Sequence, residues 1–279
     1  MPIVRSDLKF WERAAFTALG PSKINKLMRD DDVIFGVQQA HGMRYVNPAT
    51  LGDSCEAVLE PLGIDAAGRL AMKAALVRDG KELCTCGDLR FGFASRSTTD
   101  GLSMTKWPMD TADLTHLVAP EDPCAKDDVS NPPVSGSSPP LADGALMLQL
   151  DEASCSGALT LHAALRYFER HRTTYLGGPS GLQALADSGV SVVVGRVNNL
   201  RLLDAAYRVG VGDALELRCR PILKARNTQI LFEQWLTTPD GTPLARGDVA
   251  CVCLDAEAGK MCPAPLAALK VVERYMNKA

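Results

Sequence analysis

Leu165-Arg166-Tyr167-Phe168-Glu169-Arg170 decides the fold, because a second stretch near the N-terminus repeats its pattern. Leu8-Lys9-Phe10-Trp11-Glu12-Arg13 has the same order of leucine, basic, aromatic and acidic residues. Both stretches run on to a Leu-Gly pair, at Leu19-Gly20 and Leu176-Gly177. The copies lie 157 residues apart, which is too long a period for a solenoid and matches the size of one small domain. We interpret the chain as one domain that was duplicated and fused.

The repeat continues downstream in nearly constant register. The matched pairs are Gly36 with Gly195, Gly52-Asp53 with Gly212-Asp213, Glu56 with Glu216, Pro61 with Pro221, and Gly87-Asp88 with Gly247-Asp248. The offset grows only to 160 residues, so the insertions are short. We expect an N-terminal repeat over residues 1–93, a linker over 94–143, a C-terminal repeat over 144–262 and a tail over 263–279.

The composition agrees with two globular domains. The chain has 279 residues, of which 46% are hydrophobic, enough to build a buried core. Its formal net charge is −3 and its Lys and Arg residues are scattered, which argues against nucleic acid as a partner. The sequence has no run of about 18 apolar residues to indicate a membrane span, and residues 1–7 lack the apolar core of a signal peptide. We expect a cytoplasmic protein.

The nine cysteines raise the question of a metal site. Cys84 and Cys86 form one C-x-C pair and Cys251 and Cys253 form another, whereas structural zinc sites favour a spacing of about two to four residues on a tight turn. Each pair falls in a predicted strand, where residues i and i+2 share a face, and cysteine packs well as a small buried residue. We therefore predict buried free thiols, no metal and no cofactor.

Each repeat is predicted to contain one helix followed by four antiparallel strands. In the first repeat the helix covers residues 8–19 and the strands cover 33–45, 55–64, 69–78 and 81–93. In the second repeat the helix covers residues 163–176 and the strands cover 190–204, 214–224, 228–236 and 243–254. Ser6 or Asp7 can cap the first helix, Gly20-Pro21 ends it, and Gly177-Gly178-Pro179 ends the second.

Three segments fall outside this shared pattern. A strand over residues 144–151 and a loop over 152–157 precede the second helix, and the first repeat keeps at most a stub of them at residues 2–4. Residues 94–143 are rich in Ser, Pro, Asp and Thr, which predicts a long, partly disordered linker. The tail is predicted to contain a short amphipathic helix over residues 266–276.

One helix, preceded by a strand and loop and followed by a four-strand meander, is the hotdog pattern. The second repeat carries residues at a matching spacing: Gly157, His162, Tyr167-Phe168-Glu169 and Arg172. This set resembles the loop-and-helix signature of 4-hydroxybenzoyl-CoA-thioesterase-like proteins, and residues 206–217 resemble the start of that family's following strand. The resemblance implies an α+β fold of two tandem hotdog domains, each a long helix wrapped by an antiparallel sheet, packed as a pseudo-dimer.

The same resemblance implies activity on acyl thioesters. The family's motif has an aspartate three residues before the glycine, where this chain has Ser154, with Cys155 beside it. Asp151 and Glu152 are carboxylates, but they lie out of register with the motif. Similar hotdog enzymes of polyketide pathways hydrolyse thioesters without that acid, through backbone donors and water. Hydrolysis is therefore the first expectation for this chain.

Five residues are candidates for catalysis: His162, Gly157, Asn198, Glu169 and Cys155. Unpaired amides at a helix start can bind a thioester oxygen as it becomes an oxyanion, and Gly157 would let the substrate approach them. His162 can serve as a general base or orient the carbonyl, with a capping contact as the alternative. Glu169 recurs as Glu12, so ion pairing or packing is its alternative. Cys155 is either a nucleophile or a small neutral filler.

Four further residues are candidates for substrate binding: Tyr167, Asn199, Gln38 and His41. Asn198 and Asn199 lie on the first strand after the second helix, and the matching strand of the first repeat carries Gln38 and His41. Polar side chains on these strands would face a cleft from either half. His171 falls out of phase with the histidine at the helix start and is predicted to face solvent.

We expect one working site per chain, because only the second repeat has the complete strand and loop before its helix. The acyl chain would enter an apolar tunnel between that helix and the first repeat, and the expected partner is an acyl-CoA or acyl-carrier-protein thioester. Two alternatives stay open: dehydration, isomerisation or cyclisation of a carrier-bound polyketide, and acyl binding without catalysis. We expect no nucleic acid and no membrane as partners, and edge-to-edge sheet pairing would allow a homodimer of double hotdogs.

Overall fold

The computed structural model describes residues 4–19, 33–47, 54–95, 120–125, 132–133, 146–154, 157–266, 269–270 and 272–273. The first repeat contains α1 (Val4–Leu19), β1 (Val33–His41), β2 (Met43–Tyr45), β3 (Glu56–Ile64), β4 (Leu70–Arg78) and β5 (Lys81–Ser95). The strand predicted over residues 33–45 is divided at Gly42, where φ is +68°. Asp79 and Gly80 both have a positive φ, as a two-residue type I′ hairpin requires, and they join β4 to β5.

The second repeat contains β6 (Leu146–Met147), α3 (Leu161–Tyr175), α4 (Gly178–Asp187), β7 (Val190–Leu202), β8 (Ala214–Lys224), β9 (Gln229–Thr237) and β10 (Pro243–Asp255). Two predictions are wrong here. In the described part of the strand predicted over residues 144–151, only β6 is extended, because the chain turns at residues 150–152. The segment predicted as a helix break is a further helix, α4: Gly177 ends α3 with a φ of +88°, and Pro179 lies in the first turn of α4, where its missing N–H is harmless.

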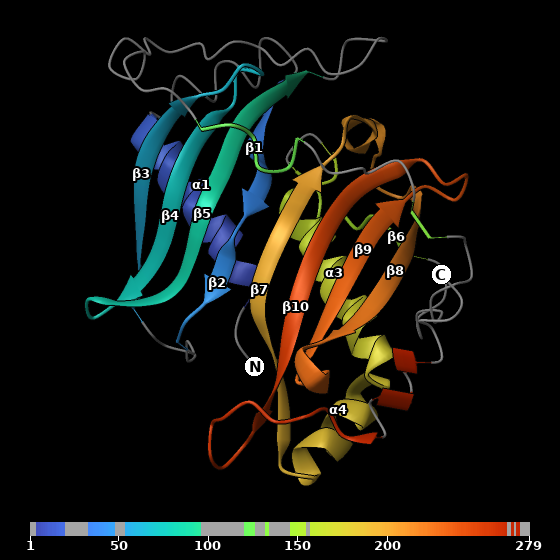
Figure 1. Cartoon of the computed structure of the whole chain (residues 1–279). Coiled ribbons are helices and arrows are strands. Elements are labelled where there is room, and N and C mark those ends of the chain that lie inside the picture. The colour runs from blue at the N-terminus through green and yellow to red at the C-terminus, as the bar shows by residue number, and fades with distance from the viewer. Residues whose placement is uncertain are drawn as a thin grey trace.

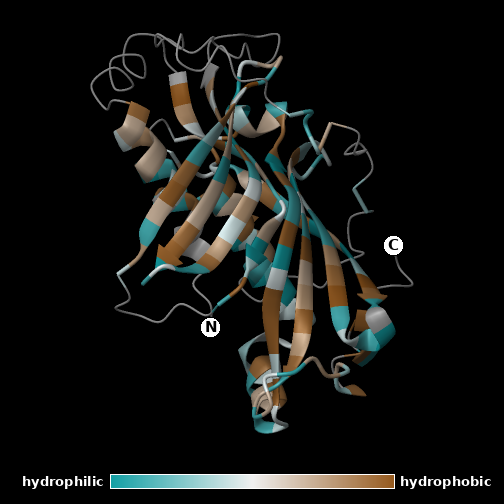
Figure 2. Ribbon diagram, turned by 60° about the vertical axis from the view of Figure 1, so that its left-hand side comes forward, coloured by the Kyte–Doolittle hydropathy of each residue, from teal (hydrophilic) through white to brown (hydrophobic). Residues whose placement is uncertain are grey.

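The described strands form one antiparallel sheet of ten strands (Figure 1). The order along the sheet is β3-β4-β5-β1-β7-β10-β9-β8-β6, and β2 pairs with both β5 and β7. Figure 2 shows hydrophobic and hydrophilic residues alternating along the strands, as expected for a sheet with one face against a core. Helices α1 and α3 lie on the same side of this sheet, one for each half (Figure 1).

The two halves are joined where β1 meets β7. These strands pair antiparallel at only two positions, Gln39 with Arg201 and Ala40 with Leu200, and β2 adds a short pairing of Met43 with Val197. The other edge of β1 pairs with β5, and the other edge of β7 pairs with β10, so each strand belongs mainly to its own half of the sheet. This junction gives the chain the arrangement of a dimer whose two subunits share one sheet.

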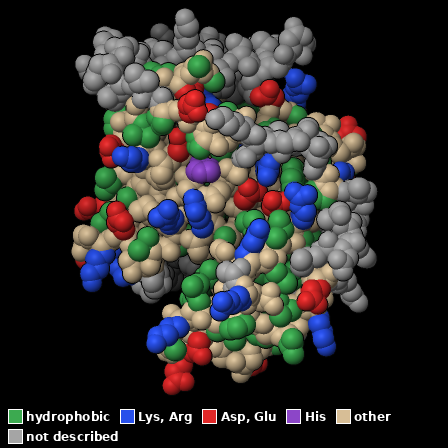
Figure 3. Space-filling model, viewed as in Figure 1, with side chains coloured by type: hydrophobic (Ala, Val, Ile, Leu, Met, Phe, Trp, Pro, Cys, Tyr) green, Lys and Arg blue, Asp and Glu red, His purple; other side chains and the backbone are tan. Residues whose placement is uncertain are grey.

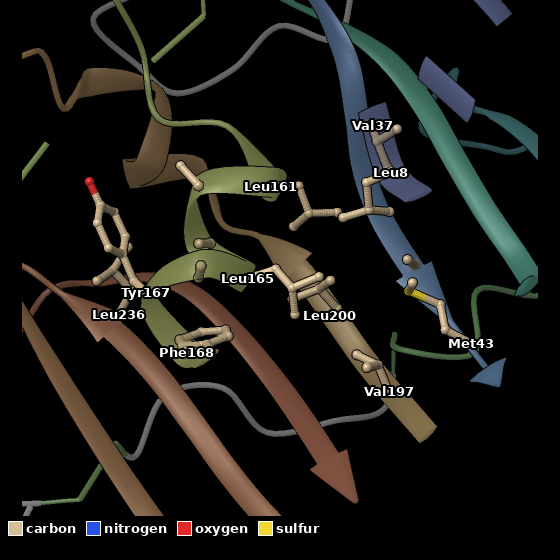
Figure 4. Packing of buried hydrophobic residues seen from close by; sticks show 14 of the residues in the cluster. Leu8, Val37, Met43, Leu161, Leu165, Tyr167, Phe168, Val197, Leu200 and Leu236 are labelled. Carbon is tan, nitrogen blue, oxygen red and sulfur yellow. The ribbon is translucent and has the colours of Figure 1, made fainter. Parts of the chain in front are cut away.

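One hydrophobic core runs through both halves. Leu8, Trp11 and Ala15 face inward from α1, and the Trp11 indole N–H donates to the backbone oxygen of Ala75 on β4 (3.1 Å). Leu161 of α3 points toward Leu8 of α1 across the junction (Figure 4). All these side chains except that of Ala75 belong to a single buried cluster, so each helix covers its own sheet and also seals the contact between the repeats.

The burial of polar and sulfur-bearing side chains tests two further predictions. The expectation that His171 faces solvent is wrong: it is 1% exposed, and its ring packs edge-on against Tyr175 with centroids 5.2 Å apart. The two C-x-C pairs are buried as predicted, at residues 84, 86, 251 and 253. Among the described residues, no group of three or more His, Cys, Asp or Glu is placed to hold a metal ion.

A short part of the linker packs onto the first repeat. Residues 120–125 lie against the sheet, where Asp122 accepts hydrogen bonds from Gln39 (2.7 Å) and pairs with Arg69 (2.5 Å). Arg90, which is fully buried, donates to the backbone oxygens of Pro120 and Glu121. Most of the predicted linker lies outside the described residues, as does much of the predicted tail helix, of which residues 266, 269–270 and 272–273 are helical. No helix within the described ranges is long and apolar enough to cross a bilayer.

Candidate active site

A pocket of about 510 Å³ opens between the two repeats. One wall is the outer side of α1, a second is the first half of β1, and the third is the loop before α3 with the first turn of that helix. The lining residues are Lys9, Glu12, Arg13, Phe16, Thr17, residues 34–38, residues 151–154, residues 159–162, Leu202 and Tyr207. The pocket therefore needs both repeats: the first supplies α1 and β1, and the second supplies the loop and the helix start.

The loop before α3 is held by a tight set of backbone and hydroxyl contacts. Gly157 has a φ of +81°, and its N–H donates to the oxygen of Ser154 (2.9 Å). The next amide, of Ala158, donates to the Ser154 hydroxyl oxygen (3.1 Å). The amide of Gly157 is thus already engaged in the turn, and Gly157 itself does not line the pocket.

The start of α3 presents its first amides to the pocket. Thr160 is the N-cap: its hydroxyl oxygen accepts from the amide of Ala163 (3.1 Å), and the hydroxyl donates to the backbone oxygen of Glu152 (3.0 Å). The first amides of a helix have no acceptor inside the helix and carry a partial positive charge. Leu161 and His162, the next two residues, both line the pocket, so the first turn of α3 lies at the pocket wall.

Glu12 faces the pocket from the opposite repeat. It is half-buried on α1 and lies against β1 at Gly36, where an added Cβ would be 3.5 Å from its carboxyl oxygen. Burial raises the pKa of Glu12 to about 7, and the charge of Lys9, one turn earlier, lowers it in part. A carboxyl group that titrates near neutral pH can accept or deliver a proton under ordinary conditions.

A second carboxylate, that of Glu152, is built into the loop wall. Its side chain is buried, accepts a hydrogen bond from the hydroxyl of Tyr167 and pairs with Arg166 at 3.3 Å. Burial and the adjacent Glu152 carboxylate raise the pKa of Tyr167, so its hydroxyl stays a donor. Because two partners from α3 hold this carboxylate, Glu152 fixes the loop against the helix.

Only some of the residues predicted for the site lie together. His162 and Gln38 both line the pocket, and both are buried. Tyr167 is fully buried behind the pocket wall, where it supports Glu152. Glu169 lines a separate cavity on the far part of α3. Cys155 lies outside the described residues.

His41, Asn198 and Asn199 lie away from the pocket, at the junction of β1 and β7. The ring Nδ1 of His41 is 2.9 Å from the amide oxygen of Asn199, whose amide nitrogen donates to Asp248 (2.7 Å). Cys124 of the linker lies 3.7 Å from the same ring nitrogen. Asn198 accepts a hydrogen bond from Arg196. These contacts hold the junction and the linker together. The pocket lining includes none of His41, Asn198, Asn199 and Cys124.

Sequence reasoning missed Glu12 and Glu152 as pocket residues. Glu12 was interpreted through its repeat partner as a packing residue, and Glu152 was set aside because it is out of register with the family motif. A helical-wheel argument could have identified Glu12, since the buried positions Leu8, Trp11 and Ala15 place it at the edge of the apolar face. The position of Glu152 depends on the turn at residues 150–152, whereas the sequence pattern predicts that the strand runs on to residue 151 and the loop begins at Glu152.

No protein-family model matches this sequence, and no curated protein matches it either. Solved structures are similar over most of the chain. A putative oleoyl thioesterase from Lactobacillus plantarum matches 91% of this chain and 84% of its own, with a TM-score of 0.61 and 10% identity. An acyl-ACP thioesterase from Bacteroides thetaiotaomicron matches 85% of this chain and 83% of its own, with a TM-score of 0.54 and 14% identity. The 12:0-ACP thioesterase from Umbellularia californica matches 85% of each chain, with a TM-score of 0.54 and 11% identity.

These similarities extend across both repeats and the junction between them. At such identities they establish the fold and leave the chemistry to the residues of the site. The protein is a double hotdog: two tandem hotdog domains of the α+β class, packed as a pseudo-dimer, as the sequence predicted. The structures that share this arrangement are named as acyl thioesterases.

Proposed function

We propose that this protein hydrolyses acyl thioesters in the pocket between its two repeats. The observation that carries the proposal is the position of Glu12: a carboxyl group with a pKa of about 7 faces the first turn of α3 across a largely apolar pocket. Thioester hydrolysis needs a base for water on one side of the carbonyl and hydrogen-bond donors for the developing oxyanion on the other. The pocket supplies both from opposite walls.

The reaction would run in two steps. The backbone amides of the first turn of α3 hold the thioester oxygen, while Glu12 removes a proton from a water molecule that attacks the carbonyl carbon. The tetrahedral intermediate then collapses, the carbon–sulfur bond breaks, and the thiolate leaves and takes up the proton from Glu12. The products are a carboxylic acid and a free thiol, and Glu12 is ionised again.

His162 and Gln38 are positioned to orient the reacting groups. Both are buried pocket residues, one at the start of α3 and the other on β1, so each can hydrogen-bond to a polar atom of the bound substrate. The Glu152–Tyr167 pair keeps the loop that carries this wall in place. We assign these residues positioning roles and reserve the proton transfer for Glu12.

The pocket walls also suggest the kind of substrate. Phe16, Phe35 and Leu202 give the interior an apolar lining suited to an acyl chain. Lys9 and Arg13 are exposed at the same pocket, where their charges suit the phosphate groups that CoA and the phosphopantetheine arm of a carrier protein share. We propose an acyl group on one of these carriers as the substrate.

A free-thiol assay over a panel of acyl-CoA and acyl-carrier-protein thioesters tests the proposal. We expect release of thiol by the wild-type protein and a fall in kcat of about a hundredfold or more in Glu12→Gln, the range lost with a general base. Glu60→Gln, which removes an exposed carboxylate far from the pocket, should retain wild-type activity. Equal activity in both variants would refute the role of Glu12. A changed acyl mass without thiol release would instead favour dehydration or cyclisation.

A further inference from the structure

A second cavity, of about 590 Å³, lies between α3, α4 and the first part of β7. Its walls are mainly apolar: Val190, Val192 and Val194 come from β7, and Leu182 and Leu185 come from α4. Helix α3 supplies Glu169, Arg172, Thr173 and Leu176, which fall at i, i+3, i+4 and i+7 and so share one face of the helix. The volume lies within the range of pockets that bind small molecules, roughly 300–1,000 Å³.

This cavity is the repeat equivalent of the first pocket. The duplication relates Glu169 to Glu12 on the long helices, and residues 193–194 of β7 to residues 34–35 of β1. Each of these residues lines the cavity of its own repeat. The fused chain has therefore kept a binding-sized space at both of its related positions.

The two cavities differ in what closes them. Within the described ranges, the first is closed by the loop 151–154 and the start of α3, whereas the second is closed by α4, whose residues Leu182, Gln183, Leu185 and Ala186 contribute to its wall. Among the described residues that line the second cavity, none belongs to the first turn of a helix except Pro179, which has no N–H to donate. The second cavity thus lacks the paired amides that would stabilise an oxyanion, and its arrangement suits binding without hydrolysis.

Arg172 gives the second cavity a specific polar feature. Its side chain is 3% exposed, Nη1 donates to the amide oxygen of Gln234 (2.7 Å), and Nη2 has no hydrogen-bond partner among the described residues. Burial raises the pKa of the Cys251 thiol, and the charge of Arg172 and a side-chain hydrogen bond between the two residues lower it in part, so Arg172 contacts another residue of the cavity wall. A buried guanidinium N–H without a partner is costly and requires an acceptor.

The geometry points to a binding site for a long-chain carboxylate, with the hydrocarbon chain along the valines of β7 and the leucines of α4 and the carboxylate accepting a hydrogen bond from Nη2 of Arg172. A carboxylate provides a charge-assisted acceptor in the geometry that a guanidinium favours. Glu169, on the same helix face, is the one acidic side chain among the described lining residues, and its charge would weaken such binding. Removing that charge should therefore tighten it.

Calorimetric titration with sodium dodecanoate tests the site. The titration is made on Thr17→Trp, because Thr17 is exposed and lines only the first pocket, which the indole would obstruct. We expect one bound dodecanoate. Adding Ala186→Trp, at an exposed residue of the second cavity, should weaken binding by about tenfold or more as the indole occupies the chain's place. Ala184→Trp, exposed on the same helix but outside the cavity lining, is the matched control and should leave binding unchanged.

The head group is tested by changing the ligand and, separately, by removing the acidic charge of the lining. Dodecanol should bind Thr17→Trp about tenfold or more weakly than dodecanoate, and adding Glu169→Gln should tighten the binding of dodecanoate. Absence of dodecanoate binding, equal weakening by both tryptophan substitutions in α4, or equal affinity for the alcohol and the acid would overturn the assignment. Because the titration involves no turnover, its outcome does not depend on whether the first pocket hydrolyses thioesters.

Discussion

Glu12 and Glu169 occupy equivalent positions in the two repeats, but their surroundings differ in charge. Three residues after Glu169 the second repeat has Arg172, whereas three residues after Glu12 the first repeat has Ala15. Both of these later residues are buried, so α3 has a buried cation at the position where α1 has a buried methyl group. The substitution leaves Glu12 in a more apolar setting, consistent with the rise in its pKa to about 7 through burial.

The pKa of Glu12 predicts how the activity depends on pH. A general base must be ionised, so kcat/KM should rise through pH 7 and be about tenfold lower at pH 6 than at pH 8. The measurement is the rate of thiol release between pH 5.5 and 8.5, with the thiol detected by a reagent whose response is corrected for pH. The residual activity of Glu12→Gln should lack this limb, and a limb retained in that variant would assign the titration to another group.

The same shift predicts a change in stability. The folded-state pKa of Glu12, about 7, is above the ordinary value of 4.5, so the folded state binds more protons between these values and stability attributable to this group falls as pH rises through them. Glu12→Gln removes the buried charge and should raise Tm at pH 8 while changing it little at pH 4.5. Thermal unfolding of both proteins at the two pH values measures this, and an equal change in Tm at both would contradict it.

At the scale of elements, the sequence predicts a strand or helix correctly where the residues of that segment specify it, and incorrectly where tertiary packing does. The strands β7 to β10 lie within two residues of their predicted bounds because alternation and turn residues specify them locally. The sequence pattern does not predict α4, because Gly177 ends α3 directly before α4 begins at Gly178, and Gly177-Gly178-Pro179 is typical of a helix break. His171 was misplaced because α3 buries more than one face, being packed against the sheet, α1 and α4, which is a tertiary property. Gln38 lies in the pocket, whereas His41, Asn198 and Asn199 lie at the junction of β1 and β7. This difference depends on the three-dimensional neighbours of each strand residue, which the sequence pattern does not specify.

A third prediction concerns the contact between Tyr167 of α3 and Glu152 of the loop that precedes this helix. Tyr167→Phe removes the hydroxyl that donates to Glu152 and lies 3.3 Å from the backbone oxygen of Met147, and it leaves a buried carboxylate with Arg166 as its remaining described partner. We expect the free energy of unfolding to fall by about 1–3 kcal/mol and kcat to fall with it, because the pocket wall loosens. Denaturant unfolding and thiol release measure the two effects. A loss of stability without any change in kcat would show that this loop does not position the substrate.

At the scale of the whole molecule, the two repeats have two related cavities and a hydrophobic core that spans both halves. The face shown in Figure 3 has acidic and basic side chains interspersed, without a field of one sign. Among the described residues, the second repeat supplies both the loop and helix start that complete the first pocket and the helix α4 that closes the second cavity. The proposed division of labour, hydrolysis in one cavity and carboxylate binding in the other, follows from this difference between the cavity walls.

The shared core and sheet predict that both halves unfold together. A single buried cluster spans the repeats, and β1 and β7 join them into one sheet, so neither half can open without exposing apolar surface of the other.

Trp11 and Trp235 are both buried, one in each half, and serve as separate probes once Trp107, which lies outside the described residues, is replaced by Phe. In that background, Trp11→Phe and Trp235→Phe leave one probe each. Their fluorescence transitions in denaturant should each be single, and their midpoints, corrected for the stability change that circular dichroism measures for each variant, should coincide. Two separated transitions in either protein would mean that the repeats are independent domains and that the pocket between them is formed by docking alone.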